Sequence, residues 1–377
     1  MKKAAILLMV MTFLTGCIPK NYIERLGIIT AVGYDLIEDD RLRGTLVMFQ
    51  FDPTAANNSQ VVTGEAETSK GIRFATNRLT SQQLVSGQVR LEIFQDQLAS
   101  KGMMKYMDTL QRDAKISDMG YLAVSNVPTS NMLKSNNSES HPNTGNYIQQ
   151  LIEKSIKDES IPNAVLTGFM HDFYDTGKDP VLPLLTLEED KTVIQGLGLF
   201  QDDRFVDAIS HEQTFYLMLM KQEFDHGQFQ IELDSDSMQD FYRKSTNEQV
   251  SEGDLHVSLH ELSTERTIKP TKGQPTKQSV HLKMESRLLE ITKEIELKDK
   301  KAINALEKEL EIAIEKKLGS IMTIFKEAQV DPVGFGAKYN TENRSNRVTN
   351  ENWREQIPEL DIEFKVDFKL LRYGITE

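Results

Sequence analysis

The sequence predicts an α+β protein of several domains, with helices packed on antiparallel or mixed sheets. Three observations support this class. Segments that alternate polar and apolar residues, such as 255–259 and 362–370, are typical of strands with one wet face. A long segment, 299–329, carries an apolar stripe at helical spacing. The order strand, strand, long helix, strand predicts an antiparallel C-terminal sheet with this helix on one face.

The composition is that of a globular protein. The chain has 377 residues, of which 39% are hydrophobic and 27% are charged, and this length favours two or three domains. Cys17 is the only cysteine, so intramolecular disulfides are impossible and the fold must rest on packed cores.

The first 17 residues have the pattern of an export signal. Lys2 and Lys3 precede a short apolar run that is too short to span a bilayer as a helix, and the run ends in Leu14-Thr15-Gly16-Cys17. This ending resembles the bacterial lipobox, in which the cysteine sulfur receives a diacylglycerol and the chain is cut just before the cysteine. The alternative is an ordinary signal followed by an unrelated cysteine.

The predicted mature chain is strongly acidic. Removal of residues 1–16, which include Lys2 and Lys3, would change the net charge from −13 to about −15. Such a body is repelled by nucleic acid and by anionic lipid surfaces. We therefore expect no nucleic-acid partner, and we expect the lipid on Cys17 to hold the protein on the membrane.

After a tether over residues 17–25, the pattern predicts an N-terminal α+β domain over residues 26–191. Residues 26–35 and 42–51 are expected to form an antiparallel pair with a turn at 38–40, and residues 52–67 are expected to form a loop. A helix should begin at Thr68 or Ser69 and carry Ile72, Ala75 and Leu79 on one face. The remaining predicted elements are strands at 89–94 and 121–127 and helices at 99–112 and from 147 to 156.

A C-terminal α+β domain is predicted over residues 192–377. It should begin with a hairpin whose first strand is 192–200 and whose turn is 201–204, followed by an amphipathic helix at 210–221. Strands are expected at 228–233, 255–259, 281–291 and 362–370. The long helix should pack on the last sheet, and Pro332 and Gly334 should end it.

The sequence contains no convincing catalytic, metal-binding or phosphate-binding motif. His256 and His260 have a metal-ligand spacing for a helix, but the local pattern predicts a strand, where four residues span about 13 Å. Residues 334–338 and 196–198 lack the spacing of phosphate-binding and dinucleotide-binding loops. His171-Asp172 and the acidic residues 188–190 are interpreted as solvated loop charge rather than acid–base groups. The sequence thus predicts no catalytic residue, metal site or cofactor, and a protein that is not an enzyme.

A series of short motifs carries a family resemblance. In order, they are Gly16-Cys17, residues 25–35, 99–102, 110–113 and 196–200, residues 331–336 after the long helix, Trp353, and the alternating terminal strand. The series resembles the Ger(x)C family, the lipoprotein C subunits of spore germinant receptors in Bacillus-type bacteria. Gln88 is a departure, because the family often has Gly-His before that strand.

The resemblance implies a non-enzymatic subunit, lipid-anchored on the outer face of the cell or inner spore membrane. Its implied partners are two integral membrane proteins, an A-type subunit and a B-type subunit, and its implied role is nutrient-triggered germination. Two other functions remain open. A lipid-anchored solute-binding protein would need two lobes of alternating strands and helices, and the apparent antiparallel pairing argues against it. An exported enzyme would need a polar catalytic cluster.

Overall fold

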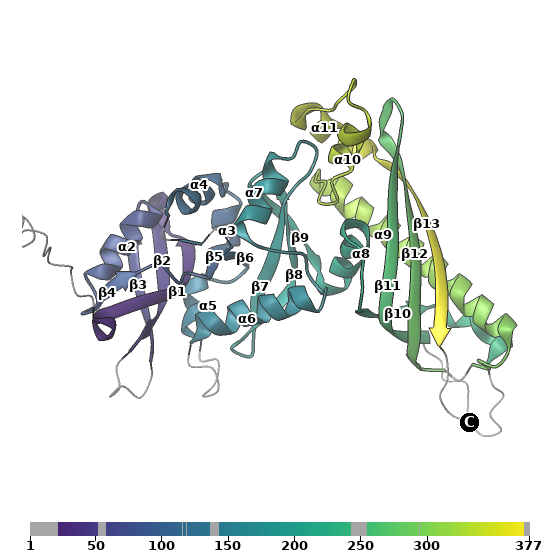
Figure 1. The fold of residues 1–377 in the computed structure, drawn as a ribbon, viewed down its shortest axis with the longest axis horizontal. Coiled ribbons are helices and arrows are strands. Elements are labelled where there is room, and N and C mark those ends of the chain that lie inside the picture. Colours follow the sequence, from purple (N-terminus) through teal and green to yellow (C-terminus); the bar gives the residue numbers. More distant parts are fainter. Residues whose placement is uncertain are drawn as a thin grey trace, which may run out of the picture.

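The computed structural model describes residues 22–51, 58–114, 116–117, 119–135, 143–242, 255–293 and 295–372. Within them the chain forms an elongated body with a sheet near each end (Figure 1). The strands are β1 (Leu26–Leu36), β2 (Leu42–Gln50), β3 (Ser59–Ala66), β4 (Gln83–Val85), β5 (Leu91–Gln95), β6 (Tyr121–Ser125), β7 (Val181–Glu188), β8 (Lys191–Gln201), β9 (Arg204–Ser210), β10 (Gly227–Leu233), β11 (Leu255–Thr271), β12 (Gln274–Ile291) and β13 (Asp361–Arg372). The helices are α2 (Ser69–Asn77), α3 (Asp96–Ala99), α4 (Met104–Arg112), α5 (Thr129–Lys134), α6 (Thr144–Lys157), α7 (Leu166–Tyr174), α8 (His211–Lys221), α9 (Lys300–Ala328), α10 (Phe335–Glu342) and α11 (Asn350–Gln356), with 3₁₀ turns η1 (Ile23–Arg25), η2 (Glu38–Asp40), η3 (Ser235–Phe241) and η4 (Ile357–Glu359).

The first sheet has the strand order β3-β2-β1-β5-β6-β7-β8-β9, and β4 also pairs with β1. The predicted hairpin of β1 and β2 is confirmed. The middle of the sheet is parallel, however, because β1 pairs with β4 and β5, and β6 pairs with β5 and β7, in the same direction. The apparent antiparallel pairing therefore gives no argument against a solute-binding protein.

Helices cover both faces of the first sheet, as expected for parallel strands buried on two sides. On one face Ile29 and Phe94 pack with residues of α2, α4 and α7. On the other face Leu91 and Ile93 pack with residues of α5 and α6. The predicted capping of the first helix by Thr68 is confirmed, because the Thr68 side chain accepts from the Gly71 N–H.

Three local predictions for this part of the chain are wrong. Residues 59–66 were expected in a loop but form β3, which pairs along β2. Leu79 was expected on the buried face of the first helix but is 65% exposed. The expected helix 99–112 is two helices, α3 and α4, because Gly102 adopts a φ of +102° between them.

The first sheet continues past residue 191. The strand β8 pairs antiparallel with β7, and β9 pairs antiparallel with β8, so the predicted boundary between residues 191 and 192 lies at the start of β8, just after the hairpin turn at residues 189–190. The helix α8 then lies between this sheet and α9 (Figure 1). It was expected to be amphipathic, but six residues from Thr214 to Met220 are buried because both of its sides are covered.

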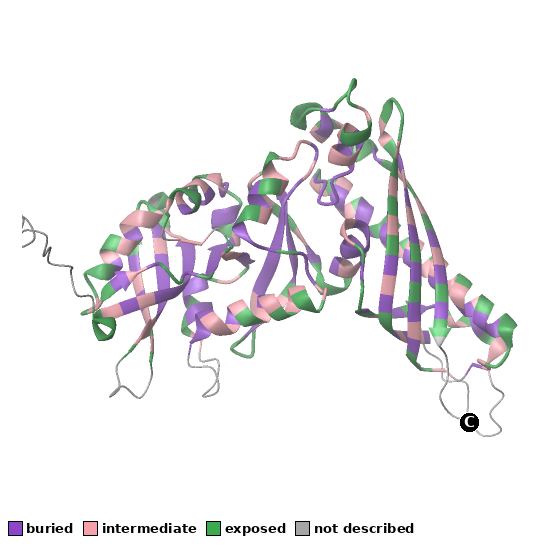
Figure 2. Ribbon diagram, viewed as in Figure 1, coloured by how far each residue is buried: buried purple, intermediate pink, exposed green. Residues whose placement is uncertain are grey.

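The second sheet has the order β10-β11-β12-β13. Its first three strands pair antiparallel, as predicted, but β13 runs parallel to β12. The long helix α9 covers one face, where Leu306, Leu310 and Ile314 share a core with Val366 and Phe368, which confirms the predicted packing. The alternation of buried and exposed residues along β11 and β12 is visible in Figure 2.

The helix α9 also covers the outer edge of β13. The carboxylates of Glu307, Glu311 and Glu315 accept the backbone N–H groups of Leu370, Phe368 and Val366 at 2.8, 3.1 and 2.9 Å. Residues four apart on a helix lie on one face, and alternate residues of a strand direct their N–H groups to one side. Three edge donors of β13 are therefore paired with side chains instead of water.

Candidate functional site: the junction at Asp331

The segment that ends α9 is built around the buried carboxylate of Asp331. Gln329 adopts a left-handed conformation at the end of α9, and Pro332 cannot continue the helix. Asp331 then accepts hydrogen bonds from Gly334 N at 2.7 Å, Gly336 N at 2.9 Å and the indole N–H of Trp353 at 3.1 Å. The predicted helix stop is confirmed, and Asp331 is the residue that organises it.

A second buried carboxylate, that of Asp179, joins this segment to the first sheet. Asp179 lies in the loop before β7, and it accepts the backbone N–H of Asp331 at 2.7 Å and that of Asp202 at 3.0 Å. The guanidinium of Arg354 on α11 donates to it twice, at 2.6 and 2.8 Å. Arg354 also donates to Asp202 and to the Gln329 carbonyl, so one side chain connects both parts of the body.

Glycines allow the backbone before β7 and the backbone after α9 to approach each other closely at this junction. Gly177 and Gly334 have φ values of +84° and +87°, which other residues rarely adopt. A Cβ atom on Gly336 would lie 2.7 Å from the Trp353 ring and 2.8 Å from the Gly177 Cα. The Ala337 N–H donates to the Gly177 carbonyl at 3.0 Å, so the contact is made by main chain as well as side chains.

A third acidic side chain nearby, that of Asp172 on α7, was interpreted as solvated loop charge, and this interpretation is wrong. Asp172 forms ion pairs with Lys178 at 2.7 Å and Lys221 at 3.1 Å, and Lys221 also donates to the Pro332 carbonyl. Burial raises the pKa of Asp172, but Lys221 and Lys178 outweigh it and hold the pKa below its usual value. The neighbouring His171 and residues 188–190 are exposed.

The three buried or partly buried carboxylates at the junction all have hydrogen-bond or ion-pair partners. Burial raises the pKa of Asp331 to about 6, against the opposing effect of its backbone N–H donors. Asp179 and Asp172 are held by cations, and each carboxylate has several partners. Such an arrangement fixes two parts of a fold relative to one another, and it presents no unpaired acid–base couple of the kind that catalysis requires.

The other residues considered from the sequence are not brought together. His256 and His260 both lie on the strand β11, as expected, where His260 is exposed and His256 is half-buried. In the described parts of the chain, no group of three His, Cys, Asp or Glu residues could hold a metal ion. Cys17 lies outside the described residues, and no helix among those that are described is long and apolar enough to cross a membrane.

Several large apolar side chains are exposed near the end of the body where the described chain begins. Tyr22 and Ile23 are 54% and 47% exposed, and Phe51 and Leu79 are also exposed. The segments that carry them are joined, because the start of β1 pairs with the end of β2 and with β4, and because Gln82 bonds Gln50 at 3.0 Å. Figure 1 shows β4 and the start of β1 at one extremity, far from the second sheet.

Comparison with known proteins identifies relatives along the whole chain. Residues 19–187 match a family model described as spore germination protein N-terminal domain, and residues 195–374 match one described as spore germination B3/GerAC like, C-terminal. The spore germination protein GerQC of Bacillus cereus is 23% identical over 379 residues, which is all of both chains. The crystal structure of the GerBC protein aligns with a TM-score of 0.54 and 13% identity, over 90% of this chain and 97% of that one.

Proposed function

We propose that this chain, which belongs to the Ger(x)C family of spore germination proteins, is the lipid-anchored C subunit of a germinant receptor. It acts without catalysis, beside integral membrane A-type and B-type subunits, in the inner spore membrane. The observation that carries the family part of the proposal is the pair of family matches, which together cover most of the chain. A transporter's solute-binding protein, the other function considered from the sequence, has no support from these relatives.

The anchor is proposed to be a diacylglyceryl group on Cys17. A single myristoyl chain holds a protein on a membrane only marginally, and stable anchoring takes two signals. A diacylglyceryl cysteine supplies two acyl chains in one residue. This suffices without a basic patch on a chain whose net charge is −13.

The exposed apolar side chains at the end of the body nearest Cys17 in the sequence support this anchor. Tyr22 is five residues from Cys17, and five residues span at most about 18 Å. A lipid on Cys17 would therefore hold Tyr22, Ile23, Phe51 and Leu79 close to the bilayer surface. Aromatic and aliphatic side chains are favourable at that interface. The acidic remainder of the elongated body would extend away from anionic headgroups and towards its partners.

Spores that carry Cys17→Ala test the anchor. We expect loss of labelling by a fatty-acid probe, because the variant has no thiol to acylate. We also expect loss of the response to the nutrients that this receptor serves, with other germination triggers intact. Because Cys17 contributes to neither of the two described cores, the variant should keep its unfolding midpoint in urea, which separates loss of the anchor from loss of the fold.

Two outcomes would contradict the proposal. Fatty-acid labelling that persists in Cys17→Ala would show that the lipid is attached to a residue other than Cys17. Normal nutrient germination without label would show that contacts with partner subunits hold the protein in place by themselves.

A variant with Ile23→Asp and Leu79→Asp, with Cys17 retained, should keep the label and weaken the association of the purified chain with vesicles.

A further inference from the structure

Glu92 occupies an apolar position in the middle of the first sheet. It lies in β5, in register with Val32 of β1 and Leu122 of β6, and it is 4% exposed. Neither of its carboxyl oxygens has a hydrogen-bond partner of good geometry among the residues described. Buried polar groups are almost always hydrogen-bonded, and leaving one unpaired is destabilising. The described fold therefore supplies no well-formed hydrogen bond to the Glu92 carboxyl.

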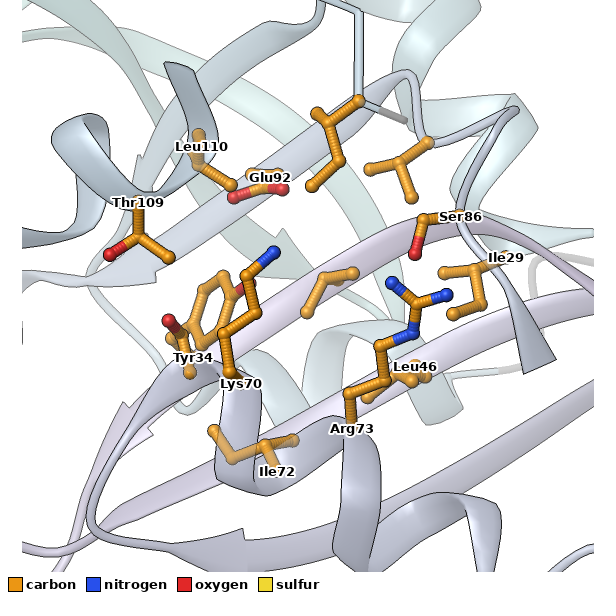
Figure 3. A pocket seen from close by; sticks show the side chains of 14 residues that line it. Ile29, Tyr34, Leu46, Lys70, Ile72, Arg73, Ser86, Glu92, Thr109 and Leu110 are labelled. Atoms are coloured by element: carbon orange, nitrogen blue, oxygen red, sulfur yellow. The ribbon is translucent and has the colours of Figure 1, made fainter. Parts of the chain in front are cut away.

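Glu92 faces a small cavity between the sheet and the helices α2 and α4 (Figure 3). The cavity has a volume of about 40 Å³, and much of its wall is apolar, including Ile29, Leu46 and Leu110. Its polar wall includes Lys70 and Arg73, which extend from α2 towards Glu92 and Ser86 in Figure 3. A water molecule needs about 10–15 Å³ by this measure, so the space holds a molecule of three or four non-hydrogen atoms.

The charges around the cavity favour an anion. Lys70 forms an ion pair with Asp113. Arg73 makes one long hydrogen bond, of 3.4 Å to the Leu84 carbonyl, and has no carboxylate partner in the described part of the chain. Burial raises the pKa of Glu92 to about 8, although Lys70 and the Tyr34 hydroxyl act to lower it. Near pH 7 Glu92 is thus mostly a neutral hydrogen-bond donor, and the Arg73 cation is uncompensated.

We propose that this cavity binds a small carboxylate of about the size of acetate. One carboxylate oxygen would receive the guanidinium of Arg73 and the other the protonated carboxyl of Glu92, while the alkyl end contacts the apolar wall. A charge-assisted pair of this kind is among the stronger hydrogen bonds. A metal ion is disfavoured by Lys70 and Arg73, and a dianion such as phosphate would leave charge unpaired beside apolar side chains.

Equilibrium dialysis of the purified full-length chain with radiolabelled acetate tests the proposal. We expect saturable binding of one acetate per chain, with competition by propionate. Acetamide has nearly the same shape but no charge, and it should not compete at tenfold higher concentration. This comparison uses only the unaltered protein, so it does not depend on how any variant folds. Absence of saturable binding, or equal competition by acetamide, would overturn the proposal.

Arg73 in the middle of α2 and Arg78, which directly follows that helix, provide a matched pair of variants. Arg73→Gln should weaken acetate binding at least tenfold, because it removes the uncompensated cation. Arg78→Gln removes an exposed charge outside the cavity and should leave the affinity unchanged. Arg73→Lys keeps the charge and should fall between them. Equal affinities for the Arg73→Gln and Arg78→Gln variants would place the acetate elsewhere and refute the site.

A pH profile identifies the partner of the second oxygen. The groups around Glu92 are Tyr34 from β1, Lys70 and Arg73 from α2, and Asp113 after α4. Burial raises the pKa of Tyr34 well above its usual value, so its proton is retained. Acetate affinity should fall at least tenfold from pH 7 to pH 9 as Glu92 ionises. Glu92→Gln keeps a donor and should remove this fall; an unchanged profile would exclude Glu92 from the site.

Discussion

Arg354 on α11 and Asp179 before β7 form a two-point ion pair, with N–O distances of 2.6 and 2.8 Å, although 175 residues separate them in the chain. Asp179 is 2% exposed, and its other donors are backbone N–H groups of Asp202 and Asp331. The pair therefore connects the first sheet, the end of α9 and α11 through one buried carboxylate.

Replacement of Arg354 by alanine should lower the free energy of unfolding by about 3–5 kcal/mol, because it leaves the Asp179 carboxylate buried without its cation. Urea unfolding followed by circular dichroism measures this. Arg344→Ala is the matched control, since Arg344 is exposed and should change stability by less than about 0.5 kcal/mol. Equal midpoints for both variants would mean that the ion pair contributes nothing to the junction.

Gly334→Val should lower stability by about 1–3 kcal/mol, because Gly334 has a φ of +87° and a β-branched residue is strained there. Gly319 on α9 is the control. It is exposed, and a Cβ atom added there would meet no neighbouring element within 4 Å, so Gly319→Ala should stabilise the protein by up to about 1 kcal/mol. If Gly334→Val unfolds normally and only germination is lost, the segment is a contact surface rather than a structural helix stop.

Leu310→Ala should cost about 2–5 kcal/mol, since Leu310 is fully buried and the substitution leaves a cavity between α9 and the second sheet. Ile312, two residues along the same helix, is 46% exposed, and Ile312→Ala should cost far less. The urea midpoints of the two variants give the comparison. A Leu310→Ala midpoint equal to that of the unaltered chain would contradict the observed packing.

Glu92 should make stability depend on pH. The folded carboxyl has a pKa of about 8 and an ordinary one of 4.5, so only the unfolded chain releases this proton between those values. The contribution of Glu92 to the free energy of unfolding is therefore fully favourable below pH 4.5 and is lost as the pH rises towards 8. From pH 6 to pH 8, Glu92→Gln should remove about 2 kcal/mol of this loss of stability. Asp331, whose pKa is raised to about 6, titrates in both proteins, so its contribution cancels in the comparison. Parallel stability curves for the two proteins would refute this.

Local pattern predicted most elements and several antiparallel pairs, but it predicted neither the parallel pairs of the two sheets nor the edge strand β3. The strand β3 contains Ser59, Gln60, Thr63 and Glu65, and its sequence alone is typical of a loop. It is a strand because the free edge of β2 supplies a ladder from Leu42 to Phe49. Likewise, alternation in β13 predicts a strand with one buried face, but the same alternation occurs in parallel and antiparallel pairs.

The junction was predictable only in part. Pro332 and Gly334 indicate a helix stop through local backbone chemistry, and the stop is present. The role of Asp331 depends on Trp353, and that of Asp179 depends on Arg354, and no local rule joins residues so far apart. Glu92 could have been noticed, because an acidic residue inside the apolar run Leu91 to Phe94 is unusual for a strand covered on both faces.

The position of β13 determines the order in which the second sheet can assemble. Its parallel partner β12 ends at Ile291, and α9, α10 and α11 must be synthesised before residue 361 is available. Until then, one edge of β12 and the row of glutamates on α9 have no partner. Exposed strand edges are sites of aggregation, and long-range parallel pairing forms slowly. A nascent chain synthesised only as far as Leu360 would therefore depend on chaperones, and a premature stop there would leave an aggregation-prone product instead of a shorter folded protein.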